Sequence, residues 1–214
     1  MTVGVVVALV AALLAAAVHY QPAATRAEIP VGESAERAAA RMLSKASAVA
    51  AGLERPGPWG EAITEAEANA WLARDLPRLA GRLPAGWQAL GVRFHPRQVA
   101  CSGIVGYGAA RARWWAILEV GLPRPDEIVV TVDSAGLGLV PLPSGMVLSA
   151  IARLATEARW PAEIRLHDGI PRLHVIVSGH PPGARADRGG YHLEGLRIDE
   201  GELVFAGSTQ APPR

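Results

Sequence analysis

The chain has 214 residues, with 21 basic and 20 acidic side chains and a formal net charge of +1 at pH 7. A charge this close to balance lacks the excess of basic side chains that nucleic-acid binding requires, so we expect no nucleic-acid partner. The only cysteine, Cys101, excludes an intramolecular disulfide, and its apolar neighbours favour a buried thiol over a reactive one. About 195 residues follow the N-terminal apolar run, enough for one domain with its own core.

The N-terminal run, residues 1–18, contains no charged side chain. A helix of that length reaches roughly 27 Å, close to the thickness of the hydrocarbon core of a bilayer. We therefore expect residues 1–19 to be a transmembrane helix of a single-pass cell-membrane protein. A cleaved signal peptide is the alternative, because the alanines at 15–17 suit a signal peptidase, although no basic residue precedes the run. Short N-terminal apolar segments commonly direct export, so we expect the main domain on the extracytoplasmic side.

Residues 20–32 mix prolines with polar side chains, which predicts a spacer between membrane and domain. A single α+β domain is expected over residues 33–209. Its first helix is predicted to start near Ser34, a suitable cap, and to end at Pro56, which lacks an amide donor. The apolar stripe of this helix is narrow and rich in alanine, so the helix either rests on the domain or stands as a stalk.

The second helix has the clearest local signal. Thr64 and Glu67 form a capping box, in which each side chain accepts a hydrogen bond from the backbone amide of the other residue. The helix is therefore predicted to begin here. Asn69 lies inside it, where asparagine is a mediocre helix former, so we expect its side chain to bond a neighbouring loop rather than to act chemically.

From Gly91 onward the apolar pattern changes to a period of two, with glycines and prolines between the segments. The predicted strands span residues 91–95, 98–107, 112–122 and 127–132. The last three of them can form a meander, and apolar side chains on both faces of the strand 112–122 predict that both faces of the sheet are partly covered. A further helix is predicted from about residue 145 to residue 158.

The C-terminal third predicts two hairpins. A two-residue turn at residues 200–201 pairs Ile198 with Leu203 on an apolar face. Residues 181–190 are predicted to be a mobile loop, and residues 210–214 a frayed tail.

The other hairpin lies around Asp168 and Gly169, and its loop length is open. A four-residue loop pairs Ile164 with Val175 and sets His174 opposite Arg165. In that register the arginine repels a histidine cation. Asp168 itself is better explained as a turn residue than as a general base.

No segment carries a recognisable catalytic signature. Ser134 lacks the preceding glycine that a nucleophile elbow requires, and the histidines have no closely spaced cysteine or carboxylate set around them. We therefore predict that the protein is not an enzyme and uses no cofactor or metal.

Two short motifs point to a family. Glu65 and Asn69 fit a Glu-x-x-x-Asn helix opening, and residues 138–143 fit a Gly-x-Leu-Pro-Leu-Pro-like segment before a helix, with Val140 in place of leucine. With the N-terminal segment they resemble the YpmS-like family of single-pass membrane proteins, over roughly residues 60–160. The resemblance implies an extracytoplasmic α+β domain related to elongated lipid-binding folds, in which a curved sheet wraps a long helix around an apolar groove.

These observations predict a membrane-tethered, extracytoplasmic binding domain. In it, a curved antiparallel sheet packed with amphipathic helices encloses a groove for a lipid or another apolar ligand. A closed core built from the same side chains is the alternative. A second hypothesis is a structural or assembly partner of an envelope protein complex, with an exposed face for protein contacts. The predicted groove residues are Trp114, Trp115, Ile117, Leu118, Met146 and Ile151.

Overall fold

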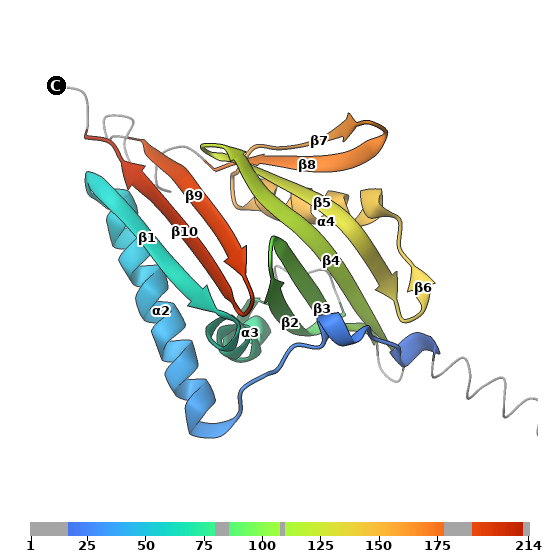
Figure 1. Ribbon diagram of the computed structural model, residues 1–214. Coiled ribbons are helices and arrows are strands. Elements are labelled where there is room, and N and C mark those ends of the chain that lie inside the picture. The colour runs from blue at the N-terminus through green and yellow to red at the C-terminus, as the bar shows by residue number, and fades with distance from the viewer. Residues whose placement is uncertain (1–16, 80–85, 108–109, 178–189, 212–214) are drawn as a thin grey trace, which may run out of the picture.

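The computed structural model describes residues 17–79, 86–107, 110–177 and 190–211 (Figure 1). Over these residues the chain has an α+β fold with two antiparallel sheets and few helices. Among them, no helix has the length and apolarity needed to cross a bilayer. Most of the predicted anchor, nearly all of the predicted loop 181–190 and the end of the predicted tail lie outside the described residues.

The helices agree with the sequence patterns, apart from one start. Helix α2 ends where expected, because Pro56 disfavours helical backbone at Arg55, which is extended with φ −120° and ψ 137°. The prediction that Ser34 caps this helix is wrong: its hydroxyl donates a hydrogen bond to the Val31 carbonyl at 2.8 Å, inside a helix that has already begun. The described helices are η1 (Ala23–Thr25), α2 (Gly32–Glu54), α3 (Glu65–Leu79) and α4 (Ser144–Glu157).

The capping box is confirmed at the start of α3. The Glu67 amide donates to the Thr64 hydroxyl at 3.3 Å, and the Thr64 amide donates to the Glu67 carboxylate at 3.1 Å. Two orphan amides of the first turn are thereby satisfied.

The larger sheet has the strand order β2-β3-β4-β5-β8-β7, and β6 pairs with β5. The predicted meander is confirmed, and it extends to all four predicted strands. The strand predicted to end at Val132 continues further, because Asp133 forms a bulge and pairing with β4 resumes at Ser134. The bounds are β2 (Trp87–His95), β3 (Gln98–Tyr107), β4 (Ala110–Arg124), β5 (Glu127–Leu137), β6 (Val140–Pro141), β7 (Ala162–His167) and β8 (Ile170–Ile176).

The smaller sheet has the order β1-β10-β9, with β1 (Gly57–Thr64), β9 (Tyr191–Asp199) and β10 (Glu202–Thr209). Its hairpin has the predicted register, with Ile198 opposite Leu203. Strand β1 is absent from the sequence-based prediction, because Pro56, Gly57 and Pro58 resemble a helix stop followed by a loop. As an edge strand that pairs only with β10, β1 tolerates Pro58.

The register predicted for the other hairpin, β7–β8, is wrong. Asp168 and Gly169 both have positive φ, at 52° and 78°, so they close a two-residue turn. Ile164 therefore faces Leu173 rather than Val175, and His174 faces Glu163 rather than Arg165. The positive φ of Asp168 confirms its role as a turn residue. The four-residue loop failed because it assumed a shared buried face, whereas Leu166 near the tip is 74% exposed.

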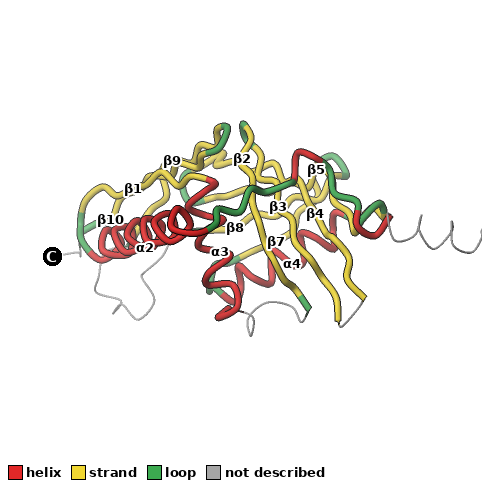
Figure 2. Tube along the Cα trace, turned by 90° about the horizontal axis from the view of Figure 1, so that it is seen from below, coloured by secondary structure: helices red, strands yellow, loops and turns green. Residues whose placement is uncertain are grey.

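The helices divide between the two sheets (Figures 1 and 2). Helix α2 rests along the smaller sheet instead of standing as a stalk, and Ala38 and Ala39 on it are buried against Ala70 of α3. Helix α4 covers one face of the larger sheet, where Leu148 meets Leu173 in a core that fully buries both. The small residues let α2 lie close to its neighbours, whereas α4 packs through larger side chains.

Residues 20–31, which make up all but the last residue of the predicted spacer 20–32, lie against the domain. The Thr25 side chain is fully buried, and its carbonyl accepts a hydrogen bond from the Ser102 hydroxyl of β3 at 2.8 Å. Further along, the Glu28 carbonyl accepts one from the Asn69 side chain at 3.3 Å. The segment therefore packs against β3 at Thr25 and against α3 at Glu28.

Candidate functional site

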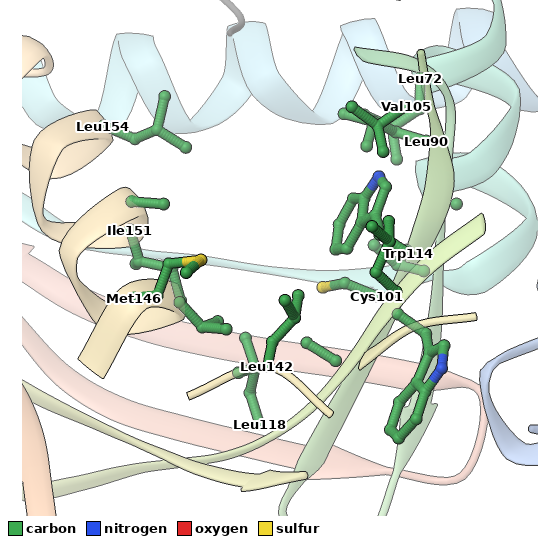
Figure 3. A pocket seen from close by; sticks show the side chains of 17 residues that line it. Leu72, Leu90, Cys101, Val105, Trp114, Leu118, Leu142, Met146, Ile151 and Leu154 are labelled. Atoms are coloured by element: carbon green, nitrogen blue, oxygen red, sulfur yellow. The ribbon is translucent and has the colours of Figure 1, made fainter. Parts of the chain in front are cut away.

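A cavity of about 340 Å³ lies between helix α4 and strands β2, β3 and β4 (Figure 3). This exceeds the roughly 150 Å³ of an engineered apolar cavity that stays dry and binds benzene, and it falls in the range of small-ligand pockets. Every described residue that lines it is apolar, a glycine or the lone cysteine. Such walls offer almost nothing for water to hydrogen-bond, so the space favours an apolar occupant.

The sheet wall follows from the two-residue period of β4. Trp114 and Leu118 point to the same face, and Cys101 joins them from the neighbouring strand β3. Gly103 pairs with Trp114 across the strands, and a Cβ atom at Gly103 would lie only 2.6 Å from the indole nitrogen. The glycine therefore makes room for the indole against the sheet.

The opposite wall is formed by α4, whose apolar residues divide between the core and the cavity. While Leu148 and Ala155 pack into the core, Ile151 and Leu154 point toward the sheet wall across the cavity (Figure 3). Met146 and Leu154 line the cavity yet remain 58% and 41% exposed. They therefore form the rim of an opening, and the cavity communicates with the outside along α4.

The cavity brings together five of the six predicted groove residues: Trp114, Trp115, Leu118, Met146 and Ile151. Ile117 is not among its lining residues: it points to the face of β4 opposite Trp114 and Leu118, between Ala100 of β3 and Ser134 of β5. Trp115 has the same alternation as Ile117 but does line the cavity, and its indole donates a hydrogen bond to the Gly138 carbonyl at 2.9 Å.

Several lining residues were not among the predicted groove residues. Leu72 comes from α3, Leu90 and Val105 come from β2 and β3, and Leu142 precedes α4. The period of two in the strands predicts that Leu90 and Val105 lie on apolar faces, and helical spacing predicts the same for Leu72. Which of these faces meet is decided by the packing of α3 and α4 on the sheet, which no local pattern encodes.

Cys101 contributes an uncharged wall. Burial raises the pKa of its thiol to about 11, so the neutral thiol dominates near pH 7. The described lining also holds no carboxylate, imidazole or hydroxyl. The described lining therefore offers a ligand apolar van der Waals contacts and, with the thiol neutral, no acid, base or nucleophile.

The histidines of the described residues and Ser134 are not among the residues that line this cavity. His174 pairs with Glu127 at 2.8 Å and His192 with Asp126 at 2.7 Å, each across neighbouring elements. Within the described stretches, no group of three or more histidine, cysteine, aspartate or glutamate side chains is arranged to hold a metal ion. The Ser134 hydroxyl donates to Asp133 at 3.2 Å.

No family model matches the chain, and neither the curated proteins nor the solved structures compared with it show a significant match. The resemblance to the YpmS-like family therefore stays a prediction.

Proposed function

We propose that the protein is a membrane-tethered, extracytoplasmic binding domain that holds a lipid or another apolar ligand in the cavity beside α4. The observation that carries the proposal is an open, wholly apolar cavity of about 340 Å³. Each ligand methylene that leaves water for such a cavity contributes about 0.8 kcal/mol, so an acyl chain gains affinity by length. In this proposal the larger sheet curves around the ligand, and the domain binds without catalysis.

The predicted anchor, residues 1–19 with the uncharged run 1–18, suits this function. The Ala17 carbonyl, at its end, accepts a hydrogen bond from the Leu139 amide at 2.8 Å. A few residues after Leu139 in the chain, Leu142 lines the cavity and Met146 forms its rim. An anchor that ends here supports a cavity opening close to the bilayer from which a lipid would enter.

The test uses the full chain reconstituted in phosphatidylcholine vesicles that contain a phospholipid with a diazirine in its acyl chain. Irradiation is expected to crosslink the lipid to peptides that contain the α4 and β3 walls. Ala150, which lines the cavity, is changed to phenylalanine to fill the space, and Ser149→Phe on the exposed side of the same helix is the matched control. We expect Ala150→Phe to abolish crosslinking at the walls, while Ser149→Phe leaves it unchanged.

Cys101 provides an independent readout, because it is the only thiol in the chain and lines the cavity. A small apolar thiol reagent, monobromobimane, applied at about pH 9 so that part of the thiol is ionised, is expected to label delipidated protein and to label lipid-loaded protein several-fold more slowly. Equal labelling rates, together with no lipid copurifying by mass spectrometry, would sink the proposal.

A second candidate function, a structural or assembly partner of an envelope complex, is favoured by a different observation. Large apolar side chains are exposed on β6 and along the β7–β8 hairpin: Val140, Leu166 and Ile170. Exposed large apolar groups at a strand edge and at a hairpin tip are candidates for protein contacts. Crosslinking in intact membranes separates the two functions, because a stoichiometric protein partner without bound lipid would favour this one.

A further inference from the structure

A second pocket, of about 720 Å³, lies on the opposite face of the meander from the apolar cavity. Ser102 and Arg113 line it from the strands, and their immediate neighbours Cys101 and Trp114 line the apolar cavity. Because neighbouring strand residues point to opposite faces, the sheet separates the two spaces. The outer wall of the second pocket is the N-terminal segment, including His19, Gln21 and Arg26.

The charge of this pocket is uncompensated. Two arginines, Arg26 and Arg113, line it, and none of its described lining residues is an aspartate or glutamate. Within the described chain, neither arginine forms an ion pair, whereas Arg93, Arg97 and Arg165 all do. A pair of unneutralised guanidinium groups in one pocket attracts an anion.

Arg113 is held in place by a built polar network. Its guanidinium donates to the Gln21 side-chain oxygen at 2.9 Å, and the Gln21 amide donates to the Thr25 carbonyl at 2.8 Å. Gln21 is only 9% exposed, and Ser102 bonds the same carbonyl from β3. The partner of the arginine is thus neutral and fixed, so its position is defined while its full charge remains available.

The pocket begins where the predicted anchor ends. His19 follows directly after the uncharged run of residues 1–18 and already lines the pocket. Basic side chains at such a position lie at the level of lipid head groups, and the guanidinium fork matches phosphate oxygens.

We propose that this pocket binds the phosphate of an anionic lipid head group in the leaflet next to the anchor. The site relies on the predicted anchor and on Arg26 and Arg113, and it is independent of the apolar cavity. A free phosphate ion offers the same chemistry, so the experiment contains an arm for each source.

The full chain is reconstituted in phosphatidylcholine nanodiscs and titrated in three arms with dihexanoylphosphatidylglycerol, dihexanoylphosphatidylcholine and inorganic phosphate, with binding measured by calorimetry. We expect saturable, salt-sensitive binding of the phosphatidylglycerol and weaker binding of the zwitterionic lipid. Because each arginine near a head group is worth about fivefold in affinity, the double variant Arg26→Gln/Arg113→Gln should bind about 25-fold more weakly.

Two further variants make the result specific. Arg113→Lys keeps the charge but lacks the planar fork, so its affinity should lie between those of the wild type and the double variant, which separates loss of charge from loss of fold. Arg55→Gln, at the far end of α2, removes an exposed arginine that has no ion pair among the described residues, and it should change nothing. Phosphate binding as strong as lipid binding, and equally sensitive to the double variant, would support the site with free phosphate as its ligand. Binding that the double variant leaves unchanged, or no preference for the anionic lipid or phosphate over the zwitterionic lipid, would overturn the proposal without touching the apolar cavity.

Discussion

The side-chain amide of Asn69 hydrogen-bonds both backbone polar groups of Val92: it donates to the carbonyl at 2.9 Å and accepts from the amide at 2.8 Å. Val92 lies on β2, an edge strand whose outward groups would otherwise lack a strand partner. One turn earlier on α3, the Glu65 carboxylate accepts from the Phe94 amide at 2.7 Å. The Glu-x-x-x-Asn spacing therefore closes a sheet edge, which gives the motif a structural role.

Replacing Asn69 by alanine should destabilise the protein by about 3 kcal/mol, because the two half-buried backbone groups of Val92 lose their partner at a typical cost of about 1–3 kcal/mol each. The measurement is the free energy of unfolding of the full chain in a neutral detergent. Ser149→Ala, an exposed change on α4, should stay within about 0.5 kcal/mol of the wild type. A loss below about 1 kcal/mol for Asn69→Ala would contradict the role of the side chain as an edge partner.

Glu67 should make stability depend on acid pH. Burial alone raises the pKa of this carboxyl, but hydrogen bonds from Lys45, the Thr64 amide and Arg41 outweigh burial and hold it at about 2, below its ordinary 4.5. The folded pKa is lowered, so the stabilisation is present above about pH 4.5 and is lost as the pH falls toward 2. At about 1.4 kcal/mol per pKa unit it amounts to about 3 kcal/mol.

The check is a series of unfolding curves between about pH 6 and pH 2. Glu67→Gln should flatten the pH dependence, while Glu36→Gln, an exposed change on α2, should preserve it. Parallel curves for wild type and Glu67→Gln would show that the ion pair contributes little.

Gly103→Ala should destabilise the sheet wall of the cavity by about 1–3 kcal/mol, because the new methyl group would overlap the Trp114 indole. A methyl group added at Gly121, on β4, would meet nothing within 4 Å, so Gly121→Ala is the matched control. Thermal unfolding of the full chain should show a lower midpoint for the first variant only. Similar midpoints for both would mean that the indole has room to move away.

His95 should make the docking of the N-terminal segment sensitive to pH. Its two ring nitrogens lie 3.1 Å from the Ala24 carbonyl and 3.1 Å from the Glu200 carboxylate, and only the doubly protonated ring donates to both. The Ala24 carbonyl, followed by Glu200, raises the pKa of His95 despite partial burial. The contribution is therefore complete below the ordinary pKa and is lost as the pH rises through the raised value.

Hydrogen exchange of the amides in residues 22–28, corrected for intrinsic rates, measures this docking. Protection should fall as the pH rises from about 6 to above 8 in the wild type and in His167→Gln, an exposed control at a hairpin tip. In His95→Gln, protection should be lower at the acid end and nearly constant with pH. Protection that stays constant with pH in the wild type would show that the charged His95 ring does not hold the N-terminal segment in place.

Local patterns predicted the elements whose causes lie within a few residues. The capping box at Thr64 and Glu67, the helix near residues 145–158 and the hairpin at residues 200–201 all depend on short-range hydrogen bonds, turn chemistry or helical spacing. The predicted β7–β8 register was wrong because it was chosen to place apolar residues on one buried face. Asp168 and Gly169, as turn residues with positive φ, close a two-residue turn instead.

By itself, the sequence determined the balanced charge, the positions of most strands and helices, and five of the residues that line the cavity. Only the tertiary structure decided that β1 joins β10, that Asn69 closes the edge at Val92, and that the N-terminal segment covers a basic pocket. The physical reason is distance along the chain. These contacts join residues far apart in sequence, and their partners are chosen by how the packed elements fit together, which local propensity does not specify.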